Sequence, residues 1–322
     1  MVQSEFDLIR RYLASRPTQR ADVLLGIGDD CALLRVPQDA ALAVTLDTLV
    51  AGIHFASDAD PVGIGHKSLA VNLSDLAAMG AVPAWATLAL TLPESDESWL
   101  AAFCEGFFAL AGQFQVQLVG GDTTHGPLSI SVQAHGFVPG HQALRRDGAN
   151  PGDLIFVTGS PGDAGMALAI LQGRLTPPSD SEQATYLQTR LDKPTPRIRQ
   201  GLELRGLASA AIDISDGLAQ DLGHILESSG LGASLQVDQL PYSPALATYA
   251  DTAIAMALAG GDDYELCFTA PPAQVERILD LAAGWDCACT QIGVIETELG
   301  LRHLRADGTV YQPVRLGYDH FA

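Results

Sequence analysis

The sequence predicts a mixed α/β protein with two domains, and three observations lead to this fold class. The chain has 322 residues, and at roughly 150 residues per domain that length indicates two domains. Apolar residues make up 47% of the chain, which is enough material for a large buried core. Segments with strand-like and helix-like patterns alternate along the sequence, without an obvious internal repeat.

The first half of the chain contains both kinds of element. Residues 4–13 begin with capping-type side chains and place apolar residues on one helical face, so they predict a short amphipathic helix. The stretch 41–50 is almost wholly apolar, as is typical of a buried strand. The same reasoning predicts the elements that follow, namely helices at 61–79 and 97–113 and strands at 85–92, 116–119 and 128–138.

A change in composition separates the two expected domains. Residues 139–152 contain two prolines and three glycines, and a new apolar strand begins at 153. We therefore expect domains at 1–140 and 141–322. The polar, proline-rich stretch 173–196 suggests a surface excursion within the second domain. The later elements alternate helix and strand through the regions of Asp213, Leu235, Leu266 and Ile292.

Charge and cysteine content exclude several classes of protein. Lys and Arg number 18 against 38 Asp and Glu, a formal charge of −20, so we expect no nucleic-acid partner. The chain shows neither a cationic start followed by an apolar run nor a stretch of about 18 apolar residues, so we expect no membrane association and a cytoplasmic location. Five cysteines without a CxxC pair indicate neither a disulfide framework nor a zinc knuckle.

The acidic residues carry the first functional signal. The 38 acids comprise 27 Asp and 11 Glu, and many of the aspartates lie beside glycine, where short carboxylates suit hard cations. Taken singly, such sites are ordinary turn or helix-cap chemistry. Six segments expected to turn tightly or to start a helix carry these acids, namely GIGDD (26–30), TLDT (45–48), NLSD (72–75), GGDT (120–123), DISDG (213–217) and GGDDYE (260–265).

Asp47 is the acid that turn chemistry does not explain, because it interrupts an otherwise apolar strand. A buried carboxylate without a partner is costly, so a compensating cation is expected there. Several carboxylates around Mg²⁺ indicate phosphate chemistry, since Mg²⁺ is commonly shared between carboxylates and substrate phosphates. The familiar nucleotide fingerprints are absent: residues 63–68 fail the Walker A spacing, and residues 26–31 lack the last glycine of a dinucleotide motif.

The motifs together resemble the thiamine-monophosphate kinase family of the aminoimidazole ribonucleotide synthetase superfamily. The match runs from about residue 4 to the C-terminus, and NxSDxxAMGA together with DxSDGL is specific as a pair. The segments that carry it occur in the family's order: GIGDDCALL (26–34), TLDTLVAGIHF (45–55), KSLAVNLSDLAAMGAVP (67–83), GGDTTHG (120–126), RRDGANPGD (145–153), DISDGLAQDL (213–222), GGDDYELCF (260–268) and GYDHF (317–321).

The resemblance implies an aminoimidazole ribonucleotide synthetase-like fold, with an N-terminal sheet domain that binds ATP and Mg²⁺ and forms a homodimer, and a C-terminal α/β domain that closes the cleft. It also implies ATP-dependent phosphorylation of thiamine monophosphate, the final step of thiamine diphosphate biosynthesis. Several Mg²⁺ ions, ATP and thiamine monophosphate are the implied cofactor, co-substrate and substrate.

The same resemblance implies the site residues at the matching positions. Catalytic roles fall to Asp47, Asp75, Asp122 and Arg146, and ATP contacts to Gly121, Asp122, Arg146 and Ser215. Substrate contacts fall to His54, Asp262 and Tyr318. The implied metal positions are Asp30, Thr45, Leu46, Asp47, Asp75, Asp122, Asp213 and Asp216, Leu46 only through its backbone oxygen.

Three positions depart from the family pattern. Ala51 stands where Glu is common, Asp262 where Glu is usual and Tyr318 where Trp is usual. The last two departures fall on substrate-contacting positions. From the residues alone, His54 also suits a structural imidazole at a strand end, and Arg146 suits one half of a solvated charge pair.

The residue types suit this chemistry. A phosphate monoester is largely dianionic at pH 7, so the acceptor oxygen needs no general base. The difficulty is repulsion between two polyanions, which Mg²⁺ and arginine relieve while they align the reacting groups. The thiazolium ring of the substrate is a cation, which carboxylates and an aromatic face such as Tyr318 or Phe55 attract.

Two rival functions remain open at this stage. One is another ATP-dependent enzyme of the superfamily that activates an amide or carbonyl oxygen, although this chain lacks the C-terminal Cys of hydrogenase maturation factors and the N-terminal Cys of selenophosphate synthetases. The other is a non-catalytic sensor of Mg²⁺-nucleotide or thiamine compounds. Retention of all the implied metal ligands favours an enzyme over a sensor.

Overall fold

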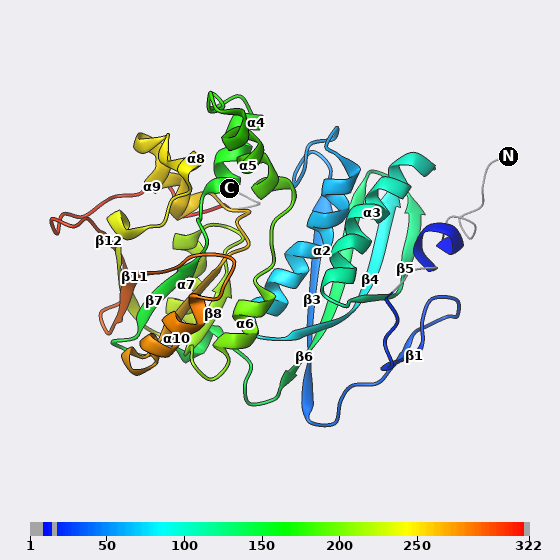
Figure 1. Ribbon diagram of the computed structural model, residues 1–322, viewed down its shortest axis with the longest axis horizontal. Coiled ribbons are helices and arrows are strands. Elements are labelled where there is room, and N and C mark those ends of the chain that lie inside the picture. The colour runs from blue at the N-terminus through cyan, green and yellow to red at the C-terminus, as the bar shows by residue number, and fades with distance from the viewer. Residues whose placement is uncertain (1–8, 15–17, 319–322) are drawn as a thin grey trace. The chain divides into compact units, whose positions relative to one another are not determined.

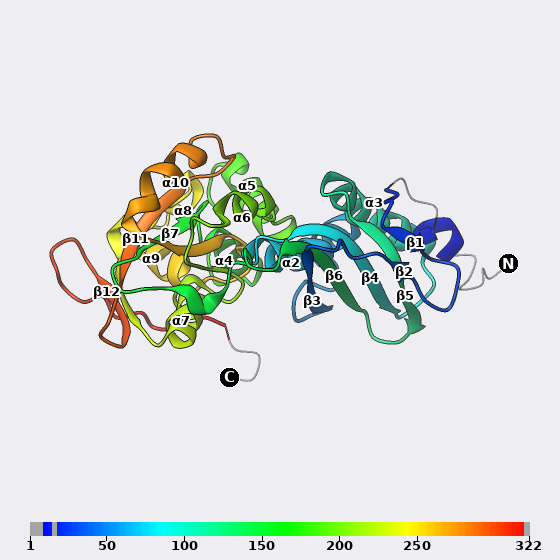
Figure 2. The ribbon, with the colours of Figure 1, turned by 90° about the horizontal axis from the view of Figure 1, so that it is seen from below.

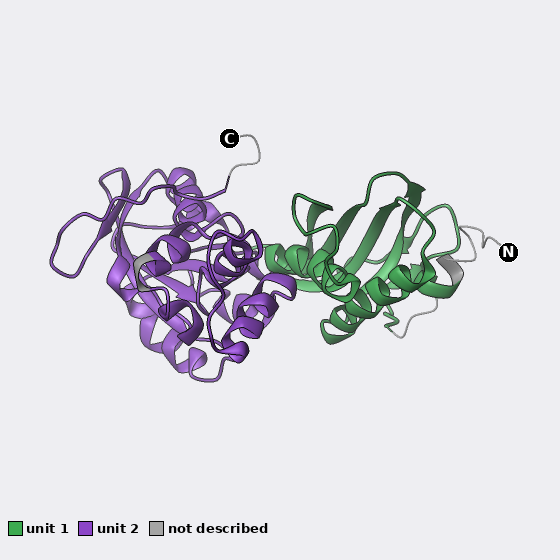
Figure 3. Cartoon of the chain, turned by 90° about the horizontal axis from the view of Figure 1, so that it is seen from above, with its two compact units in different colours: residues 1–76, 81–141 green, residues 77–80, 142–322 purple. Residues whose placement is uncertain are grey.

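The computed structural model describes residues 9–14 and 18–318. It divides into two compact units, residues 1–76 with 81–141 (unit 1) and residues 77–80 with 142–322 (unit 2) (Figure 3). Both units combine a sheet with helices, so the predicted mixed α/β class is confirmed. Among the described helices, none has the length and apolar character needed to cross a membrane.

Unit 1 is built on a four-stranded sheet in the order β3-β6-β4-β5, which Figure 2 shows side by side. Strands β4 and β5 are parallel and the other pairs are antiparallel. Strands β3 and β5 are therefore the two edges of this sheet. The bounds are β3 Ala40–Val50, β4 Val82–Leu92, β5 Gln117–His125 and β6 Ser129–Pro139.

Two long helices, α2 (Pro61–Ala78) and α3 (Glu97–Gln113), run alongside these strands (Figure 1). Helix α3 begins after Asp96, whose carboxylate accepts the backbone N–H of Ser98 at 2.8 Å, as an N-cap should. The two helices touch closely, because a Cβ on Gly106 would lie 1.9 Å from the Val62 carbonyl oxygen. Helix α2 packs on one face of the sheet, since a Cβ on Gly136 of β6 would contact Leu76.

The opposite face of the sheet is only partly covered. A short antiparallel ribbon, β1 (Val23–Leu25) with β2 (Leu33–Leu34), packs its side chains against Trp85 and Phe137. The Trp85 indole donates to Asp22 at 2.9 Å, which fixes the ribbon on the sheet. Towards β3 the same face is exposed, and the apolar side chains that face solvent there are Leu42, Val44 and Leu46.

Unit 2 contains a six-stranded sheet in the order β12-β9-β11-β7-β10-β8, antiparallel except for the pair of β9 with β12. Phe156 stacks on Phe268 at 5.2 Å between ring centroids, whereas Ile155 and Val157 point to the face covered by α7 and α9. The strand bounds are β7 Leu154–Thr158, β8 Ala210–Asp213, β9 Gly232–Gln236, β10 Leu266–Ala270, β11 Cys289–Glu296 and β12 Gly300–Leu304.

The helices of unit 2 connect these strands. The bounds are α4 Asp163–Leu171, α5 Ser181–Asp192, α6 Ile198–Leu204, α7 Leu218–Ser229, α8 Pro244–Ala247, α9 Ala250–Ala259 and α10 Val275–Ala282. Single turns of 3₁₀ helix lie at η2 Arg146–Gly148, η3 Val237–Gln239 and η4 Pro272–Gln274. Helix α7 is strongly amphipathic and buries Leu218, Leu222 and Ile225 in the core.

Several sequence-based expectations need correction. Residues 45–48 and 72–75 neither turn tightly nor start a helix, because they lie within β3 and near the end of α2. Residues 120–123 do not form a tight turn, because β5 extends to His125 and the expected strand at 116–119 was too short. The stretch 173–196 is not simply a surface excursion, since α5 lies within it and buries Leu187 and Leu191. Of the opening helix at 4–13, residues 4–8 lie outside the described residues, and Ile9–Ala14 is a π-helical segment, η1.

Candidate active site

In unit 1, the first group of predicted metal residues lies between β3 and α2. The Thr45 hydroxyl on β3 donates to the Asp75 carboxylate on α2. Burial, together with the negative charge of Asp75, raises the pKa of Asp47 to about 7. Two carboxylates and a hydroxyl therefore meet on the helix-covered face, where the two acids repel each other.

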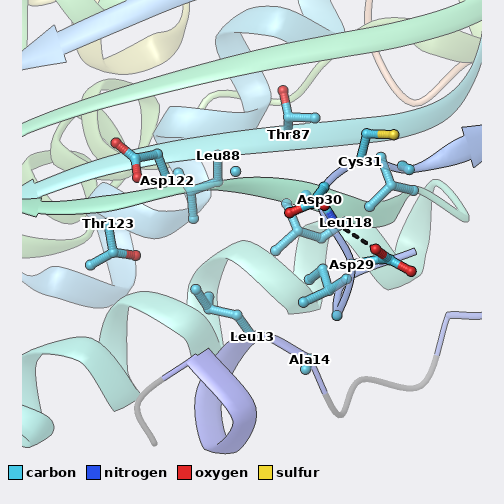
Figure 4. A pocket seen from close by; sticks show the side chains of 16 residues that line it. Leu13, Ala14, Asp29, Asp30, Cys31, Thr87, Leu88, Leu118, Asp122 and Thr123 are labelled. Atoms are coloured by element: carbon cyan, nitrogen blue, oxygen red, sulfur yellow. Dashed lines mark hydrogen bonds between the residues drawn. The ribbon is translucent and has the colours of Figure 1, made fainter. Parts of the chain in front are cut away.

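The second group lies in a pocket of about 960 Å³ beside β5 (Figure 4). Asp30 enters it from the loop between β1 and β2, and Asp122 enters it from β5. Gly121 lies next to Asp122, and a Cβ there would come within 1.9 Å of the Leu88 carbonyl oxygen. The close contact between β4 and β5 at this point therefore requires glycine. Thr87 and Thr123 add hydroxyl groups to the pocket lining.

The register of the sheet separates these two groups. Asp122 pairs with Ala89, Ala89 with Ser131, and Ser131 with Thr48, so Asp122 shares a face with Thr48. Asp47 is the neighbour of Thr48 along β3, and its side chain points to the other face. Three strand spacings of about 4.8 Å also place β3 and β5 roughly 14 Å apart. One chain therefore does not bring Asp47 and Asp122 to a common ion.

The donor chemistry of both groups fits a hard cation. Carboxylate and hydroxyl oxygens are what Mg²⁺ prefers, and the raised pKa of Asp47 reflects a carboxylate that lacks a compensating positive charge. Among the described residues, no group of three or more His, Cys, Asp or Glu side chains is arranged to hold a metal ion. Neither group of unit 1 by itself supplies a complete set of metal ligands.

The remaining predicted residues of unit 1 lie near the end of β3. Leu46 points away from the Asp47 side and is 61% exposed. His54 lies in the turn after β3, where its Nδ1 accepts the backbone N–H of Val50 at 3.0 Å. That hydrogen bond leaves the Nε2 nitrogen as the proton carrier of a neutral ring. Ala51 lies in the same turn and pairs with Phe55.

In unit 2, the predicted residues gather around the loop between β8 and α7. Asp213 ends β8 and is 4% exposed. The next turn is held by Asp221, whose Oδ2 atom accepts the backbone N–H groups of Ser215, Asp216 and Gly217, each at 3.1 Å. Burial and the charge of Asp216 raise the pKa of Asp221 to about 7, although the three N–H donors act in the opposite direction.

The predicted substrate residues of unit 2 are attached to this same loop. The Asp262 backbone N–H donates to the Ser215 carbonyl at 2.7 Å. The Tyr318 N–H donates to the Asp216 carbonyl at 3.0 Å, and Gln220 donates to the Tyr318 carbonyl. The structure therefore brings Ser215, Asp216, Asp262 and Tyr318 together from three distant stretches of the chain.

Arg146 lies at the edge of this arrangement. It begins the turn η2, its carbonyl accepts the Ser229 hydroxyl of α7 at 2.9 Å, and its side chain is exposed. The neighbouring Arg145 forms a bidentate ion pair with Asp147 at 2.6 and 2.8 Å. The solvated charge pair expected at this point is therefore Arg145 with Asp147, not Arg145 with Arg146.

Sequence reasoning missed the acids that organise unit 2. Asp221 lies inside the DISDGLAQDL motif, and its position four residues after Gly217 is the signal of an acid that caps the preceding turn. Asp263 and Glu265 lie in the GGDDYE motif, and no functional role was predicted for them. Their exposed fractions are only 1% and 0%. Their partners Arg190 and Arg197 lie far away in the sequence, and no local pattern indicates that pairing.

Family models match parts of both units. Residues 28–138 match the AIR synthase related protein, N-terminal domain, and residues 150–303 match the corresponding C-terminal domain. The fold and the site together define an AIR synthase-related protein. The chain is also 52% identical to a thiamine-monophosphate kinase of Salmonella typhimurium and 51% identical to one of Escherichia coli, over 100% of this chain and 99% of each relative. It belongs to the thiamine-monophosphate kinase family.

Solved structures agree with this assignment. A thiamine-monophosphate kinase from Stenotrophomonas maltophilia superposes with a TM-score of 0.87 at 51% identity, covering 96% of this chain and 98% of that one. A structure described as AaThiL complexed with AMPPCP and TMP gives a TM-score of 0.77 at 32% identity, covering 98% and 96%. The E. coli hydrogenase maturation protein HypE, at 20% identity and a TM-score of 0.78, shares the fold.

Proposed function

We propose that this chain transfers the γ-phosphoryl group of ATP to thiamine monophosphate and so produces thiamine diphosphate. The observation that carries this function is the full-length identity of 52% to a relative named for the reaction, in a chain that retains the acidic motifs. The likeness to a relative described as complexed with AMPPCP and TMP supports an ATP site and a thiamine monophosphate site in one fold.

The acceptor determines what the chain has to supply. Because the phosphate of thiamine monophosphate is already anionic, the reaction needs alignment and charge neutralisation rather than proton removal. We propose Mg²⁺, held by Asp30, Asp47, Asp75, Asp122, Asp213 and Asp216 with Thr45 and Leu46, as the group that neutralises the phosphate charge. Arg146 adds an exposed positive charge from the surface of unit 2.

The chain's own residues bind the two substrates. We propose that Gly121, Asp122, Arg146 and Ser215 contact ATP, and that His54, Asp262 and Tyr318 contact thiamine monophosphate. Gly121 has no side chain to obstruct a phosphate close to β5. The Asp262 carboxylate and the half-exposed Tyr318 ring offer the negative charge and aromatic face that a thiazolium cation favours. In this scheme residues 1–140 bind ATP and Mg²⁺, and residues 141–322 close the cleft.

We further propose a cytoplasmic homodimer whose subunits complete each other's metal sites. Two features of unit 1 support it: the exposed apolar stripe Leu42, Val44 and Leu46, and the separation of Asp47 and Asp75 from Asp30 and Asp122 on opposite faces. In a two-fold dimer whose two sheets meet edge to edge and enclose this bare face, the β3 edge of one chain lies beside the β5 edge of its partner. Each shared site then contains acids from two chains.

A direct assay tests the function. The purified full chain is incubated with Mg²⁺, ATP and thiamine monophosphate, and thiamine diphosphate is followed by chromatography. We expect product formation that stops when EDTA is added and resumes with excess Mg²⁺. Nucleotide binding without any product would favour the sensor instead, and product that accumulates equally in EDTA would remove Mg²⁺ from the scheme.

A further inference from the structure

Four buried charged residues contact one another at the segment 260–265 of unit 2, two from the segment and two from elsewhere in the chain. The proposed reaction gives them no role. We call Arg190, Arg197, Asp263 and Glu265 the anchor cluster. All four are buried, with exposed fractions of 9%, 6%, 1% and 0% respectively. Buried ion pairs are seldom the best route to stability, because an apolar packing of the same volume does as well. The cluster therefore calls for an explanation other than stability.

Glu265 is fixed in one orientation by four hydrogen bonds. Arg197 donates Nε and Nη2 to the two carboxylate oxygens, each at 2.6 Å, and this fork geometry sets the plane of the carboxylate. Arg190 adds a third bond at 2.7 Å and the Thr158 hydroxyl a fourth, also at 2.7 Å. Gly159 is required beside it, since a Cβ there would lie 2.1 Å from Oε1.

The same cluster also holds the backbone two residues earlier. The Nη2 atom of Arg190 that binds Glu265 also donates to the Asp263 carbonyl oxygen at 3.2 Å. The Asp263 carboxylate accepts the Gly162 backbone N–H at 2.7 Å, at the start of α4. The side chains of residues 263 and 265 are therefore fixed from the protein interior. On the other side, the backbone of this segment is bonded to the loop after β8, through Ile214 N–H to the Glu265 carbonyl and Tyr264 N–H to the Ile214 carbonyl, each at 2.8 Å.

The segment between these anchors has a costly backbone conformation. Gly261, Asp262 and Tyr264 have φ angles of 70°, 61° and 52°, in the left-handed region. For a residue other than glycine this region is unfavourable, because Cβ comes too close to the following carbonyl oxygen. Asp262 and Tyr264 are two of the three such residues in the part of the chain that the structure describes. Strain of this kind persists only where surrounding contacts enforce it, and it is concentrated at functional sites.

The enforced conformation decides where Asp262 points. Asp262 is partly exposed, whereas its neighbours Gly261 and Asp263 are buried. The Asp262 N–H donates to the Ser215 carbonyl at 2.7 Å, and its carboxylate accepts the Tyr264 hydroxyl at 3.1 Å. We propose that the anchor cluster is a positioning device that holds Asp262 in the left-handed conformation in which it binds thiamine monophosphate. Arg190 is its main positioning residue, because one of its atoms joins Glu265 to the strained backbone. This inference rests on the substrate contact of Asp262 proposed above.

The test uses Arg190→Met in the full chain, because Glu265 then keeps Arg197 and Thr158 as partners. We expect the KM for thiamine monophosphate to rise about tenfold, with the KM for ATP unchanged within about twofold, since a displaced group loses binding without losing the rest of the site. Arg190→Lys should recover most of the loss. The matched control is Asp153→Asn, a buried carboxylate at the other end of β10 that binds Ser209 at 2.6 Å, which should leave both KM values unchanged.

A double-mutant cycle separates positioning from general damage. If Arg190 acts through Asp262, then Arg190→Met adds no further rise in KM for thiamine monophosphate once Asp262→Ala is present. A further rise of the same factor in the double variant would overturn the inference. So would a lower Tm of Arg190→Met with unchanged KM values.

A variant that fails to fold and an inactive wild-type chain each require a separate interpretation. Should Arg190→Met fail to fold, Thr158→Val removes one Glu265 hydrogen bond without removing a charge, although it also removes the acceptor of the Leu266 N–H. This variant must still raise the KM for thiamine monophosphate selectively, or the inference fails. A wild-type chain that forms no thiamine diphosphate would instead overturn the proposed function.

Discussion

Asp47 and Asp122 lie on opposite faces and at opposite edges of the same four-stranded sheet. Both are predicted Mg²⁺ ligands, yet within one chain they are separated by roughly three strand spacings, about 14 Å. A single ion bound by both carboxylates would therefore require two chains, as in the proposed homodimer.

Mixed dimers should restore activity to two inactive variants. Asp47→Asn and Asp122→Asn should each lower kcat at least about 100-fold, because each removes charge that neutralises the phosphates. When the two variants are unfolded, mixed and refolded together, half of the dimers contain both chains. Each such dimer has one intact site, so activity should return to about a quarter of the wild-type value.

The control for this experiment is a mixture of Asp47→Asn with Asp75→Asn. These residues lie in one group on one face, so every site in the mixed dimer has a defect and no activity should return. Recovery in this control, or its absence in the first mixture, would contradict a site shared between subunits.

The exposed stripe on the sheet should control the oligomeric state. Val44 is 51% exposed on the bare face near β3, and a lysine there would place a charge inside an apolar interface. We expect Val44→Lys to shift the protein from dimer to monomer in sedimentation equilibrium and to lower kcat in parallel. Leu299→Lys is the control, because Leu299 is 71% exposed in unit 2. A dimeric Val44→Lys protein would show that a different surface joins the chains.

Asp221 should affect ATP binding although it is proposed to contact no ligand. Its carboxylate holds the backbone of Ser215, Asp216 and Gly217. Asp221→Ala leaves those donors without their acceptor, at a cost of about 1–3 kcal/mol in the free energy of unfolding. We expect the KM for ATP to rise about tenfold, measured by initial rates below the Tm of the variant. Glu227→Gln, an exposed change in the same helix, should change neither quantity.

Tyr318 should contribute its aromatic ring rather than its hydroxyl. The ring is 45% exposed, while the backbone of Tyr318 is held by Asp216. Tyr318→Phe and Tyr318→Trp should keep the KM for thiamine monophosphate within about twofold, and Tyr318→Ala should raise it about fivefold to tenfold, as the loss of a cation–π contact implies. The stacking role is excluded if Tyr318→Ala binds thiamine monophosphate like the wild type in calorimetry.

Much of the fold was predictable because local patterns determine it. Helix α3 begins and ends where the sequence predicts, since Asp96 caps it and Phe103, Phe107 and Leu110 form its apolar face. The end of β5 was not predictable from its own residues. GGDT has turn-forming composition, but pairing with β4 and the absence of side chains on its glycines keep it extended.

For the candidate site, the sequence suggested residues but not their arrangement in space. Motifs identify Asp30 and Asp122 without indicating that they share a pocket, because strand order and register depend on contacts distant in sequence. The pairing of Glu265 with Arg190 and Arg197 crosses about seventy residues and follows no period. Asp221 is the exception, since its spacing from Gly217 is a local capping signal.

The hydrogen bond from Tyr318 to Asp216 joins the last described residue of the chain to the loop between β8 and α7. An affinity tag or fluorescent reporter fused shortly after Tyr318 would therefore be attached close to Ser215 and Asp216, which are proposed to contact ATP and Mg²⁺. Kinetic constants measured on such a fusion would report the tag as well as the enzyme, so a cleavable tag is the appropriate choice for all the comparisons above.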